Sequence, residues 1–416
     1  MHCTHDNPRR RESGQALIIV LAILGLATGM FVYSAVSNVS RANANANTNA
    51  LKMAEVKAAL IAWAASRGDT VGNARPGELP CPDVNNDGSD NDGNCSAGRV
   101  GRVPWKTLGI PEPKGASGET LWYAVAGSFR RYNASTTPIT SDTQGNMTVY
   151  SGSTATTLTS KAIAVIFAPG NVLGSQLRDT TSAACSTTGT TIARNLCAAN
   201  YLETSGTTNN ATNNGPFISA PSSDTFNDSV LAITNEDLMP VVERRVANEM
   251  LAILAAYKAA VGVYPWADLA DGNSNGSGGN YYNHPRFPCG TALPTNWGNG
   301  GTVALPLWLT NGCAALTGWN GVIYYAAAKN RLESAGVNCT TCTGNSLTVD
   351  GVSSTDLLLI TPGGYTGSPV RSWPTTFSAI TGYFEDNENA NNTQNDNTFV
   401  TPTATTYNRD RIFKYP

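Results

Sequence analysis

The sequence predicts an α+β protein in which a long N-terminal transmembrane helix is followed by two tandem domains, each with one helix on an antiparallel sheet. Three observations support this fold class. No charged residue lies between Gly14 and Arg41, so the chain opens with a long apolar segment. Apolar residues then recur at helical spacing around Val56 and again around Met250. Strand-like runs follow both helices and share their flanking residues, which indicates an internal duplication.

The apolar segment is long enough to cross a bilayer. Residues 16–36 would extend roughly 31 Å as a helix, about the thickness of the hydrocarbon core. Three arginines precede this segment and none follows it closely, which predicts a cytoplasmic N-terminus with the rest of the chain outside. The alternatives are an uncleaved signal anchor and an ordinary secretory signal peptide, which has a shorter apolar region.

The first helix is expected to run without a break from Gln15 to Ser66. This stretch contains no proline, and its only glycines are Gly25 and Gly29. The full helix would reach roughly 75–80 Å. Residues 42–50 are mostly Ala and Asn without an apolar face, so a bend or a locally melted stretch is expected there. Beyond them the stripe that should face the sheet is formed by Met53, Val56, Leu60 and Trp63.

The strands behind the helix occur in two copies. Residues 162–170 are echoed by residues 356–363, and an apolar run of strand length precedes each, at 121–125 and 322–326. Both copies continue with a Gly-Ser pair and an Arg at one constant spacing. These matching positions are Gly174, Ser175 and Arg178 in the first copy, and Gly367, Ser368 and Arg371 in the second.

The second copy is expected to begin with a helix of its own. Asn235, Glu236 and Asp237 suit a helix N-terminus, and Pro240 is tolerated only in the first turn. The apolar stripe of this helix is Val246, Met250, Ile253 and Tyr257. We therefore predict a leader at 1–14, the membrane half of the first helix at 15–50, a first domain at 51–234 and a second domain at 235–416.

Composition indicates an extracytoplasmic surface. Charged residues make up only 14% of the 416 residues, and the net charge is −3. Polarity comes instead from Asn, Thr, Ser and Gly, with 40 glycines in the chain. This neutral, loop-rich character gives no indication of nucleic-acid binding or of another polyanionic partner.

Cysteine usage agrees with an exported protein. Eight of the nine cysteines follow Gly14, and an even number outside the cytoplasm implies disulfides. We expect nearest neighbours to pair, as Cys81–Cys95, Cys185–Cys197, Cys289–Cys313 and Cys339–Cys342. The last pair is also compatible with a redox dithiol or half of a zinc site. Thr and Gly surround it, however, and His284 is the only histidine after Gly14.

An acidic stretch between the first two of these cysteines predicts a calcium loop. Its spacing matches the first half of the D-x-D/N-x-D/N-G pattern, in which alternate oxygens point at one ion. The twelfth position is Asn94 instead of a bidentate Glu, so later aspartates are expected to complete the site. The expected Ca²⁺ ligands are Asp83, Asn85, Asp87, Asp90 and Asp92. The alternative is a solvated turn, which the same residues favour for backbone reasons.

Catalytic motifs are weak, and we expect the chain not to be an enzyme. A G-x-S-x-G match at residues 272–276 lies in a Gly/Asn loop, whereas a nucleophile elbow needs a strand before it and a helix after it. His284 is a lone loop histidine. A membrane-anchored periplasmic enzyme is therefore the least favoured interpretation.

The N-terminus resembles the leader of type IV prepilins. Arg9, Arg10 and Arg11 lie in a short charged stretch that ends at Gly14, and the apolar segment starts directly after Gln15. The resemblance implies cleavage by a prepilin peptidase between Gly14 and Gln15. It departs from the family at Gln15, where an aromatic residue or Met is usual. Ile19 also stands where main pilins carry Glu.

The resemblance implies two pilin-like domains in a minor pilin or pseudopilin of a type IV pilus or type II secretion system. Such a subunit would initiate or cap a filament, at the tip, where no docking carboxylate is needed. Its partners would be other pilins, the prepilin peptidase and the bacterial inner membrane, with periplasmic domains before assembly and an extracellular location afterwards. The alternative is a tip adhesin that binds a surface receptor or glycan.

Overall fold

A computed structural model describes most of the first half of the chain and separate parts of the second half. The described residues are 42–67, 75–90, 95, 99–131, 138–152, 156–265, 287, 303, 305–310, 319, 322–328, 333–334, 337–338, 346–364, 398–402 and 410–415.

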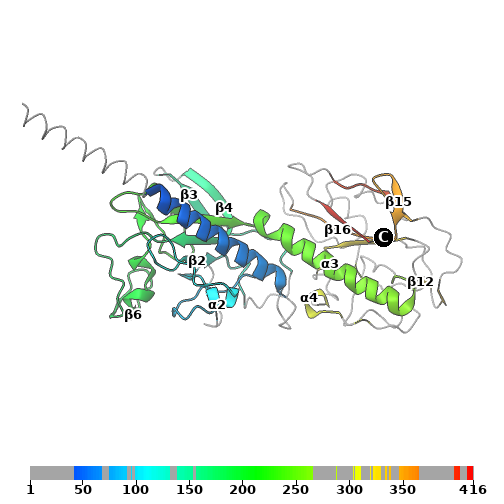
Figure 1. Ribbon diagram of the computed structural model, residues 1–416, viewed down its shortest axis with the longest axis horizontal. Helices are drawn as coiled ribbons and strands as arrows, with labels where there is room; N and C mark the ends of the chain where they lie inside the picture. Colours follow the sequence, from blue (N-terminus) through cyan, green and yellow to red (C-terminus); the bar gives the residue numbers. More distant parts are fainter. Residues whose placement is uncertain are drawn as a thin grey trace, which may run out of the picture.

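The first described element is a helix at residues 42–66. Met53, Val56, Leu60 and Ala64 form its buried stripe and belong to the hydrophobic core. This spacing of three and four places them on one helix face. Residues 42–48 are exposed, so the packed part of the helix begins at Asn49. Figure 1 shows the helix crossing the face of the first sheet.

The first sheet has six strands in the order β1-β2-β4-β3-β9, with β10 also paired to β4. The pairing of β3 with β9 is parallel, and the other pairings are antiparallel. Residues 162–168 of β4 are buried throughout, and this half of the strand pairs with β2 and with β10. The strands are β1 (Val100–Arg102), β2 (Trp122–Val125), β3 (Met147–Ser151), β4 (Thr156–Ala168), β9 (Phe217–Ser219) and β10 (Ser229–Thr234).

Short elements fill the connections of this half. Helix α2 (Trp105–Leu108) follows β1. Between β4 and β9 lie two small hairpins and two 3-10 turns, and a disulfide closes the first hairpin. These elements are β5 (Ser182–Ala184), β6 (Thr191–Ala193), η1 (Arg194–Leu196), η2 (Ala198–Asn200), β7 (Thr204–Ser205) and β8 (Thr208–Asn209).

Helix α3 (Asn235–Val261) begins where the acidic run of the sequence predicts it. The carboxylate of Asp237 accepts a hydrogen bond from the backbone N–H of Thr234 at 2.9 Å, which caps the N-terminus. Gly262, with φ of 91°, ends the helix in the left-handed conformation. Pro240 is the sixth residue of α3 and not part of its first turn, and the helix continues through it.

Helix α3 contacts both halves of the molecule (Figure 1). Near its start Asp237 pairs with Lys57 of the first helix at 2.7 Å. Near its end Lys258 pairs with Asp356, the residue before β16, at 3.2 Å. Buried residues of α3 join the two sides into one continuous hydrophobic core. The division into domains at residue 234 stays a prediction.

The second half contains several small sheets. Strands β11 (Tyr324–Ala327), β16 (Leu357–Thr361) and β18 (Arg411–Tyr415) form an antiparallel sheet that α3 contacts through β16 and β18. The remaining described elements are α4 (Leu307–Thr310), β12 (Glu333–Ser334), β13 (Val337–Asn338), β14 (Leu347–Val349), β15 (Val352–Thr355) and β17 (Thr398–Phe399).

The expected fold class is wrong. In the part of the chain that the structure describes, no helix is long and apolar enough to cross a membrane, and the first helix is described over residues 42–66. The remainder of the expected helix, residues 15–41, lies outside the described residues. The strands form six separate sheets among the described residues, instead of one sheet in each pilin-like domain. The reason lies in the many Gly-, Asn- and Thr-rich connections, which limit most strands to a few residues and turn them into local hairpins.

Candidate functional site

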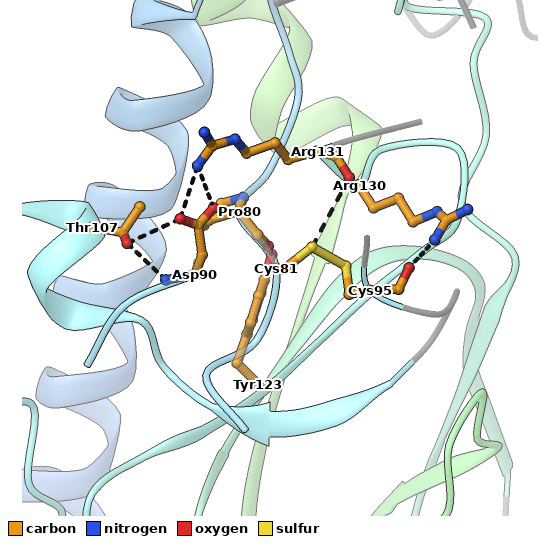
Figure 2. The surroundings of a disulfide bond; sticks show 8 residues. All are labelled: Pro80, Cys81, Asp90, Cys95, Thr107, Tyr123, Arg130 and Arg131. Atoms are coloured by element: carbon orange, nitrogen blue, oxygen red, sulfur yellow. Dashed lines mark hydrogen bonds and ion pairs between the residues drawn. A yellow bond between two sulfur atoms is a disulfide. The ribbon is translucent and has the colours of Figure 1, made fainter. Parts of the chain in front are cut away.

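The candidate site is the acidic loop between Cys81 and Cys95, which leads from the first helix towards β1. A disulfide joins these cysteines, with Cα atoms 5.8 Å apart (Figure 2). Arg130 donates a hydrogen bond to the backbone oxygen of Cys95. The hydroxyl of Tyr123 on β2 donates to the backbone oxygen of Pro80 at 3.2 Å. These contacts anchor one end of the loop to β2 and the other to the segment that follows β2.

Asp83 organises the first turn of the loop. One carboxylate oxygen accepts the backbone N–H groups of Asn85 and Asn86 at 3.1 and 2.7 Å, and the other accepts that of Gly88 at 2.7 Å. The backbone of Asp83 also pairs with Arg102 at the end of β1. Burial raises the pKa of the Asp83 carboxyl, although the three N–H donors act in the opposite direction.

Gly88 is required at its position in this turn. Its φ of 84° is strained for residues with a side chain, and an added Cβ would lie 2.6 Å from the Trp105 ring. The close approach of the Trp105 ring and the left-handed backbone conformation therefore explain why the calcium-type pattern has glycine at position 88.

Asn85 and Asp87 lie on the outer side of the turn. Asn85 accepts from the Asp87 N–H at 3.0 Å and donates to the Asp87 carboxylate at 3.3 Å. The other Asp87 oxygen accepts the N–H of Ser89 at 2.7 Å, and this hydrogen bond is the main cause of a lowered pKa for the Asp87 carboxyl. Lys106 of α2 donates to the backbone oxygen of Asp87.

Asp90 points towards Arg131 and Thr107 (Figure 2). Its side chain is only 4% exposed, and both oxygens accept from Nη1 of Arg131, at 2.8 and 2.9 Å. Thr107 of α2 donates to the same carboxylate at 3.2 Å and accepts the backbone N–H of Asp90 at 2.9 Å. Asp90 thus fixes the loop to α2 and to the segment after β2.

The hydrogen bonds of Asp83 and Asp90 limit which oxygens of the loop are available to a calcium ion. Asp83 and Asp90 already face N–H donors and a guanidinium, so an ion bound by Asp90 would have to displace Arg131. No group of three or more His, Cys, Asp or Glu that could hold a metal occurs in the described part of the chain. Asp92 lies outside that part. Calcium binding at Asp83, Asn85, Asp87, Asp90 and Asp92 therefore stays a prediction, with Asn85 and Asp87 its accessible residues.

Of the other predicted site residues, some lie in the described part of the chain and some lie outside it. A second disulfide joins Cys185 and Cys197, with Cα atoms 5.5 Å apart. Outside the described residues lie the leader positions Gly14 and Gln15 and the remaining cysteines Cys289, Cys313, Cys339 and Cys342.

Three clusters of charged and aromatic residues were missed by the sequence analysis. Arg102 stacks on the rings of Trp122 and Tyr201. Glu243 of α3 is buried where the two halves meet. The third cluster is a buried carboxyl pair, Glu203 and Asp228. The strongest sequence signal for any of these clusters is the charged Glu243 within the apolar stripe of α3. The residues that Glu243 contacts lie too far away in the sequence to be recognised from it.

Comparisons with protein-family models, with curated proteins and with solved structures find no match to this chain.

Proposed function

We propose that this chain is an exported subunit of a type IV pilus-like or type II secretion filament, present in few copies at the tip. The observation that carries the proposal is the exposed start of the first helix. Residues 42–48 are helical and exposed, and Leu51 in the next turn is 72% exposed.

An exposed Ala/Asn helix end has little to stabilise it alone. Asn is a weak helix former, and most helical stability in proteins comes from packing. A neighbouring subunit that covered residues 42–51 would bury Leu51 and supply this packing. The resemblance of the N-terminus to a prepilin leader supports the same contact, because in that family the subunits contact one another through the N-terminal helix.

The shape of the molecule supports a position at the tip. The two halves are arranged along one long axis, with the first helix on the half that lies away from the C-terminus (Figure 1). A subunit attached through that helix would carry the second half as extra bulk beside its neighbours. At the end of a filament this bulk meets no further subunit.

The test compares two exposed leucines. Leu51→Arg should lower the amount of the chain recovered with sheared filaments at least several-fold, because a charge would enter the proposed contact. Leu158→Arg is the matched control, since Leu158 is also 59% exposed but belongs to β4 and not to the helix. Quantitative immunoblotting of filament and cell fractions measures both variants, and immunogold labelling locates the wild-type chain.

Equal recovery of the two variants would contradict a contact through the first helix. Gold labelling along the whole filament shaft would contradict the position at the tip. Absence of the wild-type chain from every filament fraction would overturn the proposal as a whole.

A further inference from the structure

An open cavity lies beside the two small hairpins of the first half, and the function proposed above does not use it. Its volume is about 400 Å³. Gln176 and Glu203 line it, together with the apolar side chains of Leu173 and Leu202. Thr225 belongs to its exposed rim.

The side chains that line the cavity indicate which class of ligand it could bind. The charged residues among those that line the cavity are Glu203 and Asp224, both acidic, and no aromatic ring is among them. Sugar-binding sites commonly offer an aromatic face for stacking, which this lining does not provide. Carboxylates beside short apolar walls suit a positively charged group on an alkyl chain.

Behind the cavity Glu203 is joined to a second buried carboxyl group. Asp228 is 4% exposed, and its Oδ2 accepts the N–H of Glu203 at 2.9 Å and the amide of Asn210 at 3.0 Å. Asp228 Oδ1 is buried without a hydrogen-bond partner among the described residues. The Glu203 carboxylate accepts from Gln176 at 2.7 Å and from the N–H of Asn227 at 3.0 Å.

Both carboxyl groups are thus held by neutral donors. The nearby guanidinium of Arg178 contacts Gln176, the backbone oxygens of Gly170 and Asn200, and the carboxylate of Glu119 at 3.2 Å. Two buried acids without a cation of their own are costly when ionised. A positive charge at the base of the cavity would offset that cost.

We propose that this cavity binds the side chain of a lysine from a peptide. The ammonium group lies against the Glu203 carboxylate, and the methylene chain contacts Leu173 and Leu202. Asp224 at the rim adds a second negative charge at the entrance.

Binding should depend on pH. Burial, and then the charge of Glu203, raise the pKa of Asp228 well above its usual range. An ammonium group favours the ionised pair, so it lowers the Asp228 pKa and releases a proton. Affinity therefore increases as pH rises through the raised Asp228 pKa. The other charged groups near the pair are Asp224 at the rim and Arg178 behind Gln176.

The test uses titration calorimetry of the full chain with two short peptides that differ only in a central Lys or norleucine. The lysine peptide should bind at least about tenfold more tightly. Thr225→Arg places a competing cation at the rim and should weaken its binding at least about tenfold. Ser222→Arg is the matched control, since it adds the same charge to the same exposed loop outside the cavity.

Two further readouts separate binding in this cavity from a general attraction to negative charge. Buffers of different ionisation enthalpy should reveal proton release when the lysine peptide binds, and Asp228→Asn should abolish that release. Equal binding of the two peptides would overturn the proposal. So would equal effects of Thr225→Arg and Ser222→Arg. Because Thr225 and Ser222 are both exposed, neither variant should impair folding, and unfolding curves verify this.

Discussion

At the scale of single residues, buried carboxyl groups determine the local structure at the acidic loop and behind the cavity. Asp83, Asp90 and Asp228 are each buried, and each is held by different donors. The sequence indicated that residues 83–92 are special because of their spacing. It did not show that Asp90 turns inward, because Arg131 is 41 residues away along the chain.

Removal of the Asp90 charge should destabilise the loop. Asp90→Asn removes the ion pair between the buried Asp90 carboxylate and Arg131, so we expect a loss of about 2–3 kcal/mol in the free energy of unfolding. Urea denaturation of the purified chain measures this. Asp179→Asn is the control, because Asp179 pairs with Arg194 in an exposed position and should cause no measurable change. Equal stability of wild type and Asp90→Asn would show that the Arg131 contact is unimportant.

Asp228 should make stability depend on pH. Its folded pKa is raised above the unfolded value near 3.8, so the folded state holds the proton more strongly. The contribution of Asp228 to stability is therefore fully present below the unfolded pKa and is lost as pH rises through the folded one, by about 1.4 kcal/mol for each unit of upward shift. Asp228→Asn should remove this dependence while it keeps the side-chain shape. Urea denaturation across pH tests it, and parallel pH profiles of the two proteins would exclude the effect.

At the scale of elements, the sequence predicts helices better than sheets. Helix α3 begins at Asn235, as the acidic run indicated, because a helix start depends on neighbouring residues. The order β1-β2-β4-β3-β9 depends on contacts between distant segments, and no local pattern specifies it. In β4 itself, the exposed residues 156–161 pair, among the described strands, with β3 alone, whereas the buried residues 162–168 pair with the distant strands β2 and β10.

The cap of α3 should contribute to its stability. Asp237→Ala removes the hydrogen bond to the Thr234 N–H, a negative charge at the helix N-terminus and the ion pair with Lys57. We expect a loss of about 1–2 kcal/mol. Hydrogen exchange should show the loss first in the opening turn of α3. Glu236→Ala, one residue earlier and exposed, should have the smaller effect, and the reverse order would contradict this assignment.

The acidic loop as a whole provides the test for calcium. An ion bound at residues 83–92 would stabilise the folded state by about 2.7 kcal/mol at a hundredfold excess over Kd. The chain should then melt at a higher temperature with calcium than with a chelator, and Asp87→Ala should abolish the difference. If calcium leaves the melting temperature unchanged, the hydrogen bonds of Asp83 and Asp90 account for the loop without an ion.

At the scale of the whole molecule, Glu243 of α3 links the two halves. This carboxylate is 1% exposed and accepts hydrogen bonds from Ser141 in the first half and from Thr361 of β16 at 3.2 Å. Arg411 of β18 pairs with the same carboxylate. Its partners lie 102, 118 and 168 residues away, so the sequence alone could not reveal this junction.

Loss of the Glu243 charge should therefore weaken the joint between the halves more than either half itself. Glu243→Gln keeps the side-chain shape but leaves Arg411 without its buried counterion, at a cost of about 3 kcal/mol. Because this carboxylate bridges the two halves, the single unfolding transition expected for the wild type should separate into two in the variant. Calorimetry and limited proteolysis measure this separation. Glu249→Gln on the same helix is the control, since Glu249 pairs with Arg245 of α3 itself at 2.7 Å. A single, uniformly shifted transition in Glu243→Gln would mean that the shared hydrophobic core around α3, and not this carboxylate, makes the two halves unfold together.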